Sequence, residues 1–431
     1  MTEPTLPCPR IDSARLWTSL MALAEIGATA GGGVRRLALD DDDRRARDRF
    51  VRWCRDAGCA VRIDAVGNIF ARRPGRDATR PVVMTGSHLD TQPGGGRFDG
   101  AYGVMAGLEV LRTLNDAGIE TAAPLELVVW CNEEGTRFAP AMMGSMAYAG
   151  LLDAAQVLAS RDGAGQRYGD ELARIGYAGE GLGGDRIAAY FEAHIEQGPV
   201  LEAHGATIGA VTGGQGQRWY DLRLSGSAAH AGSTPMAGRH DALLGAARII
   251  EAARRIATAH GEGRATVGEL HVAPNSRNVV PGEVRMTLDI RHPDDTLRDA
   301  MDAQLQAAVR EAAAAESLDF SLEAVLLQPA TPFDAGCIER VRDAARREGL
   351  AQLDIVSGAA HDAVAIARIA PGGMIFVPCA GGISHNEAES ATPEDLAAGC
   401  QVLLRALLGA CGHVAATAPR ATNTVAETWT P

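Results

Sequence analysis

Residues 82–90, Val-Val-Met-Thr-Gly-Ser-His-Leu-Asp, decide the fold class and point to the chemistry. The stretch begins with apolar and β-branched residues, which is typical of a buried strand, and it ends in a turn that carries His88 and Asp90. Three further segments join an apolar strand to a polar turn in the same order: 127–134, ending in Glu133 and Glu134; 189–198, with His194 and Gln197; and 374–387, with His385. Ligands bind beyond the carboxyl ends of strands in open α/β sheets, so we expect these four turns to meet at one edge of a sheet.

Strands and helices alternate on both sides of this stretch. The apolar patterns predict strands over 60–64, 68–71, 81–85 and 125–130 and helices over 12–30, 43–57 and 103–117. The acidic run 40–43 is interpreted as the start of a helix, because carboxylates favour the positive end of the helix dipole. This alternation predicts an α/β layer with a largely parallel sheet.

Between residues 216 and 330 the pattern changes to that of a complete small unit. It predicts a strand over 219–225, a helix over 241–257, strands over 268–272 and 283–291, a helix over 296–315 and a strand over 319–327. The order β-α-β-β-α-β is that of a ferredoxin-like domain. The α/β pattern resumes with a helix over 335–348, strands over 353–356 and 373–378, and a helix over 393–408. We therefore expect an α/β domain built from residues 1–215 and 331–431, with an inserted α+β lid domain over 216–330.

Composition and charge exclude several classes of partner. Lys and Arg number 41 against 54 Asp and Glu, a net charge of −13, and aromatic residues make up only 4% of the 431 residues. A nucleic-acid or anionic-membrane binder needs a basic surface, and a binder of single strands also needs stacking aromatics. We therefore expect a small-molecule partner and no nucleic acid or membrane.

The chain also carries no sign of export. Residues 1–20 contain three prolines and no apolar run with a cleavage site, and no stretch is long and apolar enough to span a bilayer. Eight cysteines are scattered without a Cys-x-x-Cys pair, which predicts reduced thiols in a cytoplasmic protein.

The polar turns contain the residue types of a metal site. The glycine-rich segment 94–100 can bring Asp99 back beside His88, and together with Glu134, His194 and His385 this makes five candidate ligands. Imidazole and carboxylate suit Zn²⁺, Mn²⁺, Ni²⁺ or Co²⁺, and five ligands suffice for two divalent ions if Asp99 bridges them. Taken singly, each histidine is more simply interpreted as a hydrogen-bonded loop residue and each glutamate as a surface charge. The prediction of a metal site therefore depends on their shared position at strand ends.

The pair Glu133 and Glu134 favours a division of labour. Placed in a loop after a strand, one carboxylate can bind metal while the other accepts a proton from the attacking water, and we assign Glu133 as general base and Glu134 as ligand. Asp90 is a candidate to orient the ring of His88. His361 precedes a helix and either lines the pocket or is structural; the sequence does not decide between these alternatives.

The chain resembles a known family, the amidase/hydantoinase/carbamoylase branch of the dinuclear-metal aminoacylase and carboxypeptidase G superfamily. The motifs that carry the resemblance run in the expected order over nearly the whole chain: Gly-Ser-His-Leu-Asp-Thr at 86–91, Gly-Gly-Arg-Phe-Asp-Gly at 95–100, Asn-Glu-Glu-Gly-Thr-Arg-Phe at 132–138, His-Ile-Glu-Gln-Gly-Pro at 194–199, Ala-His-Ala-Gly at 229–232, Asn-Ser-Arg-Asn-Val-Val-Pro-Gly at 275–282, Asp-Ile-Arg at 289–291 and Ser-His-Asn-Glu at 384–387. The resemblance implies a metal-binding catalytic domain with the inserted lid and a homodimer formed through the lids.

The resemblance also implies a role for each site residue. One metal ion would take His88 and His194, the other Glu134 and His385, and Asp99 would be shared. The lid would supply Arg291 and Asn278 for the substrate carboxylate and His230, reaching in from the partner subunit, for the developing oxyanion. Gln197 would hold the amide or carbamoyl end, and Gly358 is counted among the substrate-binding residues. An arginine fits a carboxylate independently of the family, although a surface salt bridge is the plainer interpretation of Arg291.

The reaction implied is hydrolysis of the carbamoyl group of an N-carbamoyl amino acid to the free amino acid, ammonia and carbon dioxide. N-carbamoyl-β-alanine and allantoate offer a ureido group beside a carboxylate as well, so an allantoate amidohydrolase stays an alternative. In peptidase branches the position of His194 is typically acidic, which argues against a metallo-dipeptidase. A catalytically silent metal-binding protein is the non-enzyme alternative.

Overall fold

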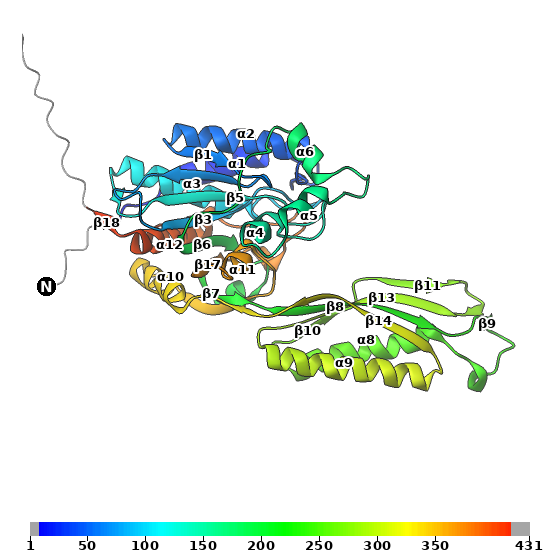
Figure 1. The fold of residues 1–431 in the computed structure, drawn as a ribbon. Coiled ribbons are helices and arrows are strands. Elements are labelled where there is room, and N and C mark those ends of the chain that lie inside the picture. Colours follow the sequence, from blue (N-terminus) through cyan, green and yellow to red (C-terminus); the bar gives the residue numbers. More distant parts are fainter. Residues whose placement is uncertain (1–7, 415–431) are drawn as a thin grey trace, which may run out of the picture. The chain divides into compact units, whose positions relative to one another are not determined.

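A computed structural model describes residues 8–414, which divide into two compact units (Figure 1). Within the described range the first unit holds residues 8–208, 339–352 and 374–414. The second unit holds Gly209–Ile338 and Leu353–Gly373. The predicted lid, 216–330, lies inside the second unit.

The first unit is built on a sheet whose centre is parallel. Its strands lie in the order β1 (Ala60–Ile63), β2 (Ile69–Arg73), β5 (Leu125–Trp130), β3 (Val82–His88), β6 (Ile187–Ile195) and β17 (Gly372–Val377). Strand β3 pairs in parallel with both β5 and β6, whereas β2 is antiparallel to both β1 and β5. The predicted α/β fold with a parallel core is confirmed, and its edge is antiparallel.

Helices cover both faces of this sheet, which explains why every residue of β3 is buried. Helix α3 (Ala101–Asp116) packs against β3, β5 and β6, α12 (Pro393–Cys411) packs against β6 and β3, and α1 (Ser13–Ala24) lies against α3 and α12. On the opposite face Trp130 of β5 makes an edge-on contact with Tyr148, the last residue of α4 (Met143–Tyr148).

The helix boundaries follow local capping chemistry. The Asp40 side chain accepts the backbone N–H of Asp43 and begins α2 (Asp41–Asp56), as the acidic run predicts. Thr392 caps α12 in the same way, with Pro393 in the first turn. The other elements of this unit are α5 (Ala154–Ala159), α6 (Tyr168–Arg174), α7 (Val200–His204), α10 (Ala335–Glu348), the short helix η2 (Ala380–Gly382), and the paired strands β4 (Glu120–Thr121) and β18 (His413–Val414).

The second unit contains the predicted ferredoxin-like arrangement. Strands β8 (Gly216–Ser225), β13 (Glu283–His292) and β14 (Asp319–Gln328) form one antiparallel sheet with the short strands β10 (Arg264–Thr266) and β11 (Leu270–Ala273), in the order β10-β13-β8-β14, with β11 also on β13. The one strand expected over 268–272 is therefore two. Thr266 opposes Asp289 and Leu270 opposes Met286, so an extra residue is accommodated between the two short strands.

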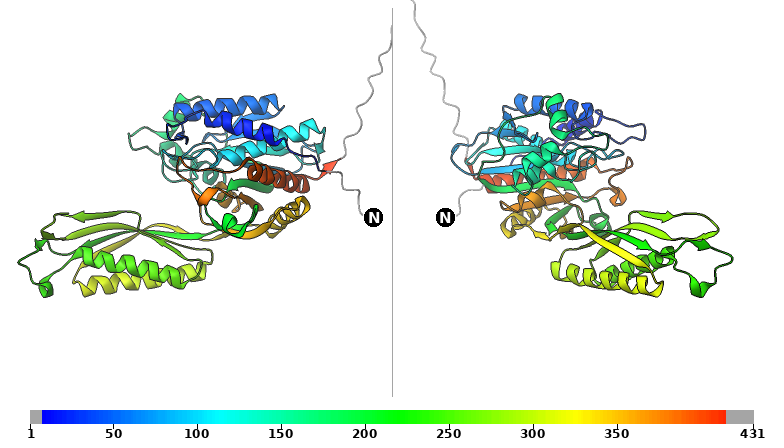
Figure 2. Two further views of the ribbon diagram at one scale, coloured as in Figure 1. Left: turned by 180° about the vertical axis from the view of Figure 1, so that it is seen from behind. Right: turned by 45° about the vertical axis from the view of Figure 1, so that its right-hand side comes forward.

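Helices α8 (Ala242–Ala259) and α9 (Asp295–Ala315) lie side by side on one face of this sheet (Figure 2). Leu222 and Leu224 of β8 point into their shared core with Ile249 of α8 and Leu305 of α9. The remaining elements of the second unit are β7 (Ile208–Gly214), β9 (Ala229–His230), η1 (Met236–Gly238), β12 (Val279–Val280), β15 (Thr331–Pro332), β16 (Gln352–Ser357) and α11 (Asp362–Ile366).

Among residues 8–414, none of the helices combines the length and the apolar character needed to cross a membrane.

Candidate metal centre

The polar turns predicted from the sequence do meet at one edge of the sheet. His88 is the last residue of β3, His194 is the penultimate residue of β6, and Glu133 and Glu134 follow the end of β5. Because these three strands are adjacent and parallel, their carboxyl ends lie together. His385 follows β17, on the other side of β6.

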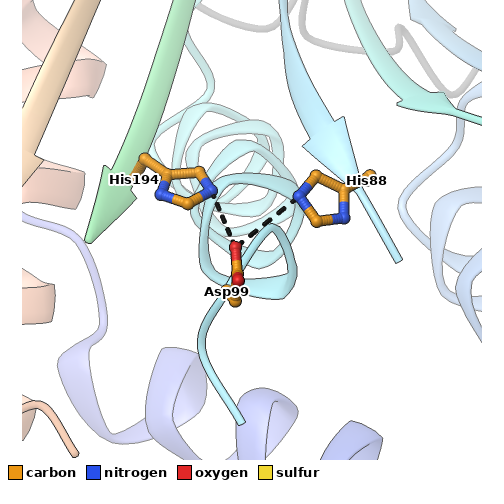
Figure 3. A group of neighbouring side chains, drawn as sticks. All are labelled: His88, Asp99 and His194. Atoms are coloured by element: carbon orange, nitrogen blue, oxygen red, sulfur yellow. Dashed lines mark ion pairs between the residues drawn. The ribbon is translucent and has the colours of Figure 1, made fainter. Parts of the chain in front are cut away.

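Asp99 lies at the centre of the cluster, between three imidazoles. Its Oδ1 atom is 3.3 Å from His194 Nε2 and 3.7 Å from His88 Nε2, and Figure 3 shows both rings turned toward this carboxylate. Its Oδ2 atom is 3.2 Å from Nε2 of His385. Each oxygen of Asp99 therefore faces a different part of the site.

The candidate ligands form two sets that share Asp99. His88, Asp99 and His194 make one set and Asp99, Glu134 and His385 the other, and in each set the ligand atoms lie within 4.8 Å of one another. The first set is buried, whereas the His385 side chain is half exposed. The grouping follows the division that the family resemblance implied.

Main-chain contacts orient the two buried rings. His88 Nδ1 lies 2.9 Å from the carbonyl oxygen of Asp90, and His194 Nδ1 lies 2.9 Å from that of Ile195. A carbonyl oxygen only accepts, so Nδ1 carries the proton in each neutral ring and Nε2 keeps its lone pair. The backbone N–H of Gly100 donates to Nε2 of His194, which agrees with this tautomer. In their neutral forms both rings thus aim an unprotonated nitrogen at the centre, which is the form that binds a metal ion.

The electrostatics of the cluster suit a cation. Burial lowers the pKa of His88 to about 4, so this ring is neutral at pH 7. Burial opposes ionisation of Asp99, but the imidazoles of His194 and His385 hold the pKa of that carboxyl well below its usual range. Burial, and then the charge of Asp99, raise the pKa of Glu134 to about 8. Burial opposes a charge on the His194 ring, but the Asp99 carboxylate raises the pKa of His194, and that of His385, to about 9. A divalent ion would take the place of these protons between the crowded carboxylates.

A second observation supports the fit. Oε1 of Glu134 is buried and has no hydrogen-bond partner among the described residues. A buried oxygen without a partner is costly unless another group satisfies it, and a cation at this position would do so. The donor set therefore fits divalent metal ions.

Glu133 lies next to the first set without belonging to it. Its Oε2 atom is 3.4 Å from His88 Nε2, and the side chain is buried. Glu134 instead lies beside His385, with 3.4 Å between Oε2 and Nε2. The two neighbouring carboxylates occupy different parts of the site, as their predicted division of labour requires.

Asp90 contacts His88 in a way that differs from the expectation. Its main-chain oxygen, and not its carboxylate, meets the ring, while the carboxylate accepts the backbone N–H groups of Glu133 and Glu134 at 3.3 and 3.2 Å. The side chain is directed there because those two N–H groups follow the end of the neighbouring strand β5. Asp90 therefore links the turn that carries His88 to the loop after β5 that carries Glu133 and Glu134, called the glutamate loop below.

Gln197 reaches the cluster from the turn after β6. Its Nε2 donates to Asp99 Oδ2 at 3.0 Å and to Ser384 Oγ at 3.1 Å. Its Oε1 is buried and has no hydrogen-bond partner among residues 8–414. The predicted substrate-binding glutamine thus lies beside the shared carboxylate.

Two contacting residues were not predicted from the sequence. Glu389 is buried and accepts the backbone N–H groups of Phe98 and Asp99 and the hydroxyl of Ser384, so it joins the Asp99 turn to the His385 loop. Gln92 donates from Nε2 to Glu134 Oε2 at 2.7 Å. For Gln92 the only sequence signal of a role at the site is its position directly after the motif 86–91. In the sequence, nothing distinguishes Glu389 from a surface glutamate.

In the second unit, the structure brings together two of the predicted lid residues. Val279 of β12 opposes His230 of β9, which places His230 beside the Asn278 segment. Nδ1 of His230 accepts the backbone N–H groups of Gly232 and Ser233, so in the neutral ring the proton is on Nε2. The ring is exposed and presents an N–H donor.

Arg291, the penultimate residue of β13, is not a lone cation. Its Nη2 lies 2.7 Å from Asp289 Oδ2, its Nε also donates to Asp289, and its Nη1 donates to the carbonyl oxygen of Gly358 at 2.9 Å. The salt bridge weighed as the plainer interpretation is thus present. The last of these contacts places Gly358, another of the predicted substrate-binding residues, beside Arg291. His361 precedes α11 and is buried.

The chain is similar to known proteins over most of its length. Residues 84–409 match the family described as peptidase family M20/M25/M40. An N-carbamoyl-L-amino-acid amidohydrolase of Rhizobium meliloti is 46% identical over 93% of this chain and 96% of its own length. An allantoate amidohydrolase of Bacillus subtilis is 34% identical over 88% of this chain and 93% of its own.

A solved structure is similar over nearly the whole chain. It is the crystal structure of an amidase of the hydantoinase/carbamoylase family from Burkholderia multivorans, with 54% sequence identity and a TM-score of 0.91. The match covers 94% of this chain and 99% of that one.

Proposed function

The chain belongs to the peptidase family M20/M25/M40, and we propose that it is a metal-dependent amidohydrolase that removes the carbamoyl group of an N-carbamoyl amino acid. The observation that carries the proposal is the pair of ligand sets that share Asp99, with Glu133 beside them. The similarity to the amidohydrolase of Rhizobium meliloti supports the substrate class. The products are the free amino acid, ammonia and carbon dioxide.

Two divalent ions, of Zn, Mn, Co or Ni, are assigned to the two sets, and when bound they activate water and polarise the carbamoyl oxygen. Glu133 accepts the proton of the attacking water and returns it to the leaving nitrogen. Its burial and its position 3.4 Å from His88, outside both ligand sets, support this role.

Residues 216–330, within the second unit, are assigned as the lid, which supplies the groups for the substrate carboxylate. Arg291 carries five N–H donors, of which Asp289 and Gly358 engage three, so its outer edge keeps one N–H on each terminal nitrogen among the described contacts. That edge suits a substrate carboxylate. Asn278 is assigned to the same carboxylate and Gln197 to the carbamoyl end.

His230 is assigned to the oxyanion of a partner subunit's substrate, in a homodimer formed through the lids. Its exposed Nε2–H donor supports this role, because an oxyanion is stabilised by a donor held in place before the reaction. The dimer is tested by co-expressing His230→Ala with Glu133→Gln, each inactive alone. If the ring acts across subunits, random pairing rebuilds one intact site in half of the dimers and restores about a quarter of the activity. No recovery would refute the shared site.

The reaction is tested by ammonia release from a panel of substrates. Protein loaded with Mn²⁺, Co²⁺, Ni²⁺ or Zn²⁺ is given N-carbamoyl-L-amino acids, their D forms, N-carbamoyl-β-alanine and allantoate, with a dipeptide as control. Cleavage of the dipeptide liberates no ammonia and is followed by the free amino groups that it releases. We expect turnover of the N-carbamoyl amino acids.

The alternatives have distinct outcomes in the same assay. Preference for allantoate would transfer the assignment to the reaction of the Bacillus subtilis relative. Hydrolysis of the dipeptide alone would refute the carbamoylase assignment, and metal binding without any hydrolysis would favour a silent metal-binding protein.

A further inference from the structure

Gln92 lies in the turn that leaves the first motif, and its side chain reaches the glutamate loop that follows β5. Its Nε2 donates to Glu134 Oε2 at 2.7 Å, and its Oε1 accepts the hydroxyl of Thr136 at 2.9 Å. A carboxylate that binds a cation is ionised and only accepts, and the hydroxyl is free to donate, so with metal bound these partners fix which end of the amide faces Glu134. One side chain thus links two positions of the loop.

The backbone of Gln92 is held on both sides. Before it, the Thr91 N–H donates to the carbonyl oxygen of Arg36 at 2.8 Å, and the Arg36 N–H donates to the Thr91 hydroxyl at 2.8 Å. After it, the Gly95 N–H donates to the carbonyl oxygen of Gln92 at 3.2 Å and closes a turn. The amide therefore starts from an anchored main chain, and Thr136 limits its rotation.

The contact determines how Glu134 presents its carboxylate. Oε2 is engaged by Gln92 and lies 3.4 Å from His385 Nε2, whereas Oε1 is buried with no hydrogen-bond partner among residues 8–414. The terminal torsion of a glutamate is broad, so without an anchor the carboxylate would sample many orientations. The amide of Gln92 restricts that torsion and keeps Oε2 beside Nε2 of His385, in the set that would hold a cation.

We propose that Gln92 is a positioning residue that orients Glu134 as a ligand of the set Asp99, Glu134 and His385, with Thr136 holding its amide. The inference rests on the proposed function, because it concerns the same site. Residues that hydrogen-bond to metal ligands typically alter metal affinity by about 10- to 100-fold when they are replaced.

The test is a metal titration that does not depend on turnover. Metal-free wild type and Gln92→Met, which has a similar volume and no amide, are titrated with Mn²⁺ in a calorimeter, and the ions retained after dialysis are counted. We expect wild type to hold two ions. Gln92→Met should bind the ion of the set Asp99, Glu134 and His385, called the second ion below, about tenfold or more weakly. His385→Ala gives the pattern expected when a ligand of the same set is lost.

Three controls separate positioning from general damage. Gln156→Met makes the same change at an exposed position of α5 outside both ligand sets, and should bind both ions as wild type does. Thr136→Val should weaken the second ion less than Gln92→Met does, and Thr136→Ser, which keeps the hydroxyl, should match wild type. The metal-free proteins should unfold at the same temperature.

The outcomes separate this inference from the proposed function. Wild-type affinity for both ions in Gln92→Met would overturn the inference, as would equal weakening of both ions or a lower unfolding temperature of the metal-free variant. A selective loss of the second ion in a protein that hydrolyses no ureido acid would sustain the role of Gln92 and overturn only the proposed substrate.

Discussion

Gly100 is the position at which a single methyl group should disable the candidate metal centre. It precedes α3 with a φ of +61°, and a Cβ built there would lie 2.4 Å from Cε1, Nδ1 and Nε2 of His88. Ordinary contact begins near 3.4 Å, so in Gly100→Ala the ring or the Asp99 turn must move by about 1 Å. The ring is buried and held by the Asp90 carbonyl oxygen. Because a displacement of about 1 Å can lower a catalytic rate about 100-fold, we expect at least that loss of turnover.

Gly118 provides the matched control for this substitution. It has the same φ of +61° after the end of α3, but nothing lies within 4 Å of its Cβ position. Both alanine variants carry the backbone strain of a positive φ. With a ψ of −50°, Gly100 also lies outside the left-handed helical region, so Gly100→Ala carries more strain, about 1–3 kcal/mol, in addition to the clash that Gly118→Ala lacks. Turnover, bound metal and urea unfolding are measured for both. The reasoning is refuted if Gly100→Ala keeps wild-type turnover and metal content, or if Gly118→Ala loses them equally.

Four further outcomes are expected. Glu133→Gln should keep its metal by elemental analysis and lose turnover by about 100-fold or more, since Glu133 lies outside both ligand sets; full activity would remove it as the base. Arg291→Ala should raise KM about tenfold or more with little change in kcat, and Arg291→Lys should recover part of the loss; an unchanged KM would exclude Arg291 from the carboxylate site. Chelation should abolish turnover and lower the unfolding temperature by a few degrees, both restored by added metal, because a ligand that binds only the folded chain stabilises it; activity that survives complete chelation would contradict the metal assignment. Burial raises the pKa of Asp64 from 3.8 to about 6, so its carboxylate is less favoured in the folded chain, and the unfolding free energy of wild type relative to Asp64→Asn should fall by up to about 3 kcal/mol between pH 4 and 6; a constant difference would disprove the shift.

Local patterns were sufficient for the framework of both units. Apolar β-branched runs predicted β3 and β5, the acidic run predicted the start of α2, and the β-α-β-β-α-β order predicted the sheet covered by α8 and α9. Each of these depends on neighbours in the chain, through alternation, capping or strand order. The interruption between β10 and β11 was not predicted, because the extra residue exists only relative to the partner strand β13.

The sequence by itself determined which residues could form the centre. The side chains that follow the strand ends identified His88, Glu134, His194 and His385 as candidates, and the glycine-rich segment 94–100 added Asp99. Tertiary structure decided what holds them there. The Asp90 carboxylate binds the glutamate loop instead of the His88 ring, and Arg291 is paired with Asp289. Glu389 binds the turn that carries Asp99, and Gln92 binds Glu134. In both contacts the partners come from separate parts of the chain. Hydrogen bonds act over about 3 Å, and only the folded chain brings their partners within that distance.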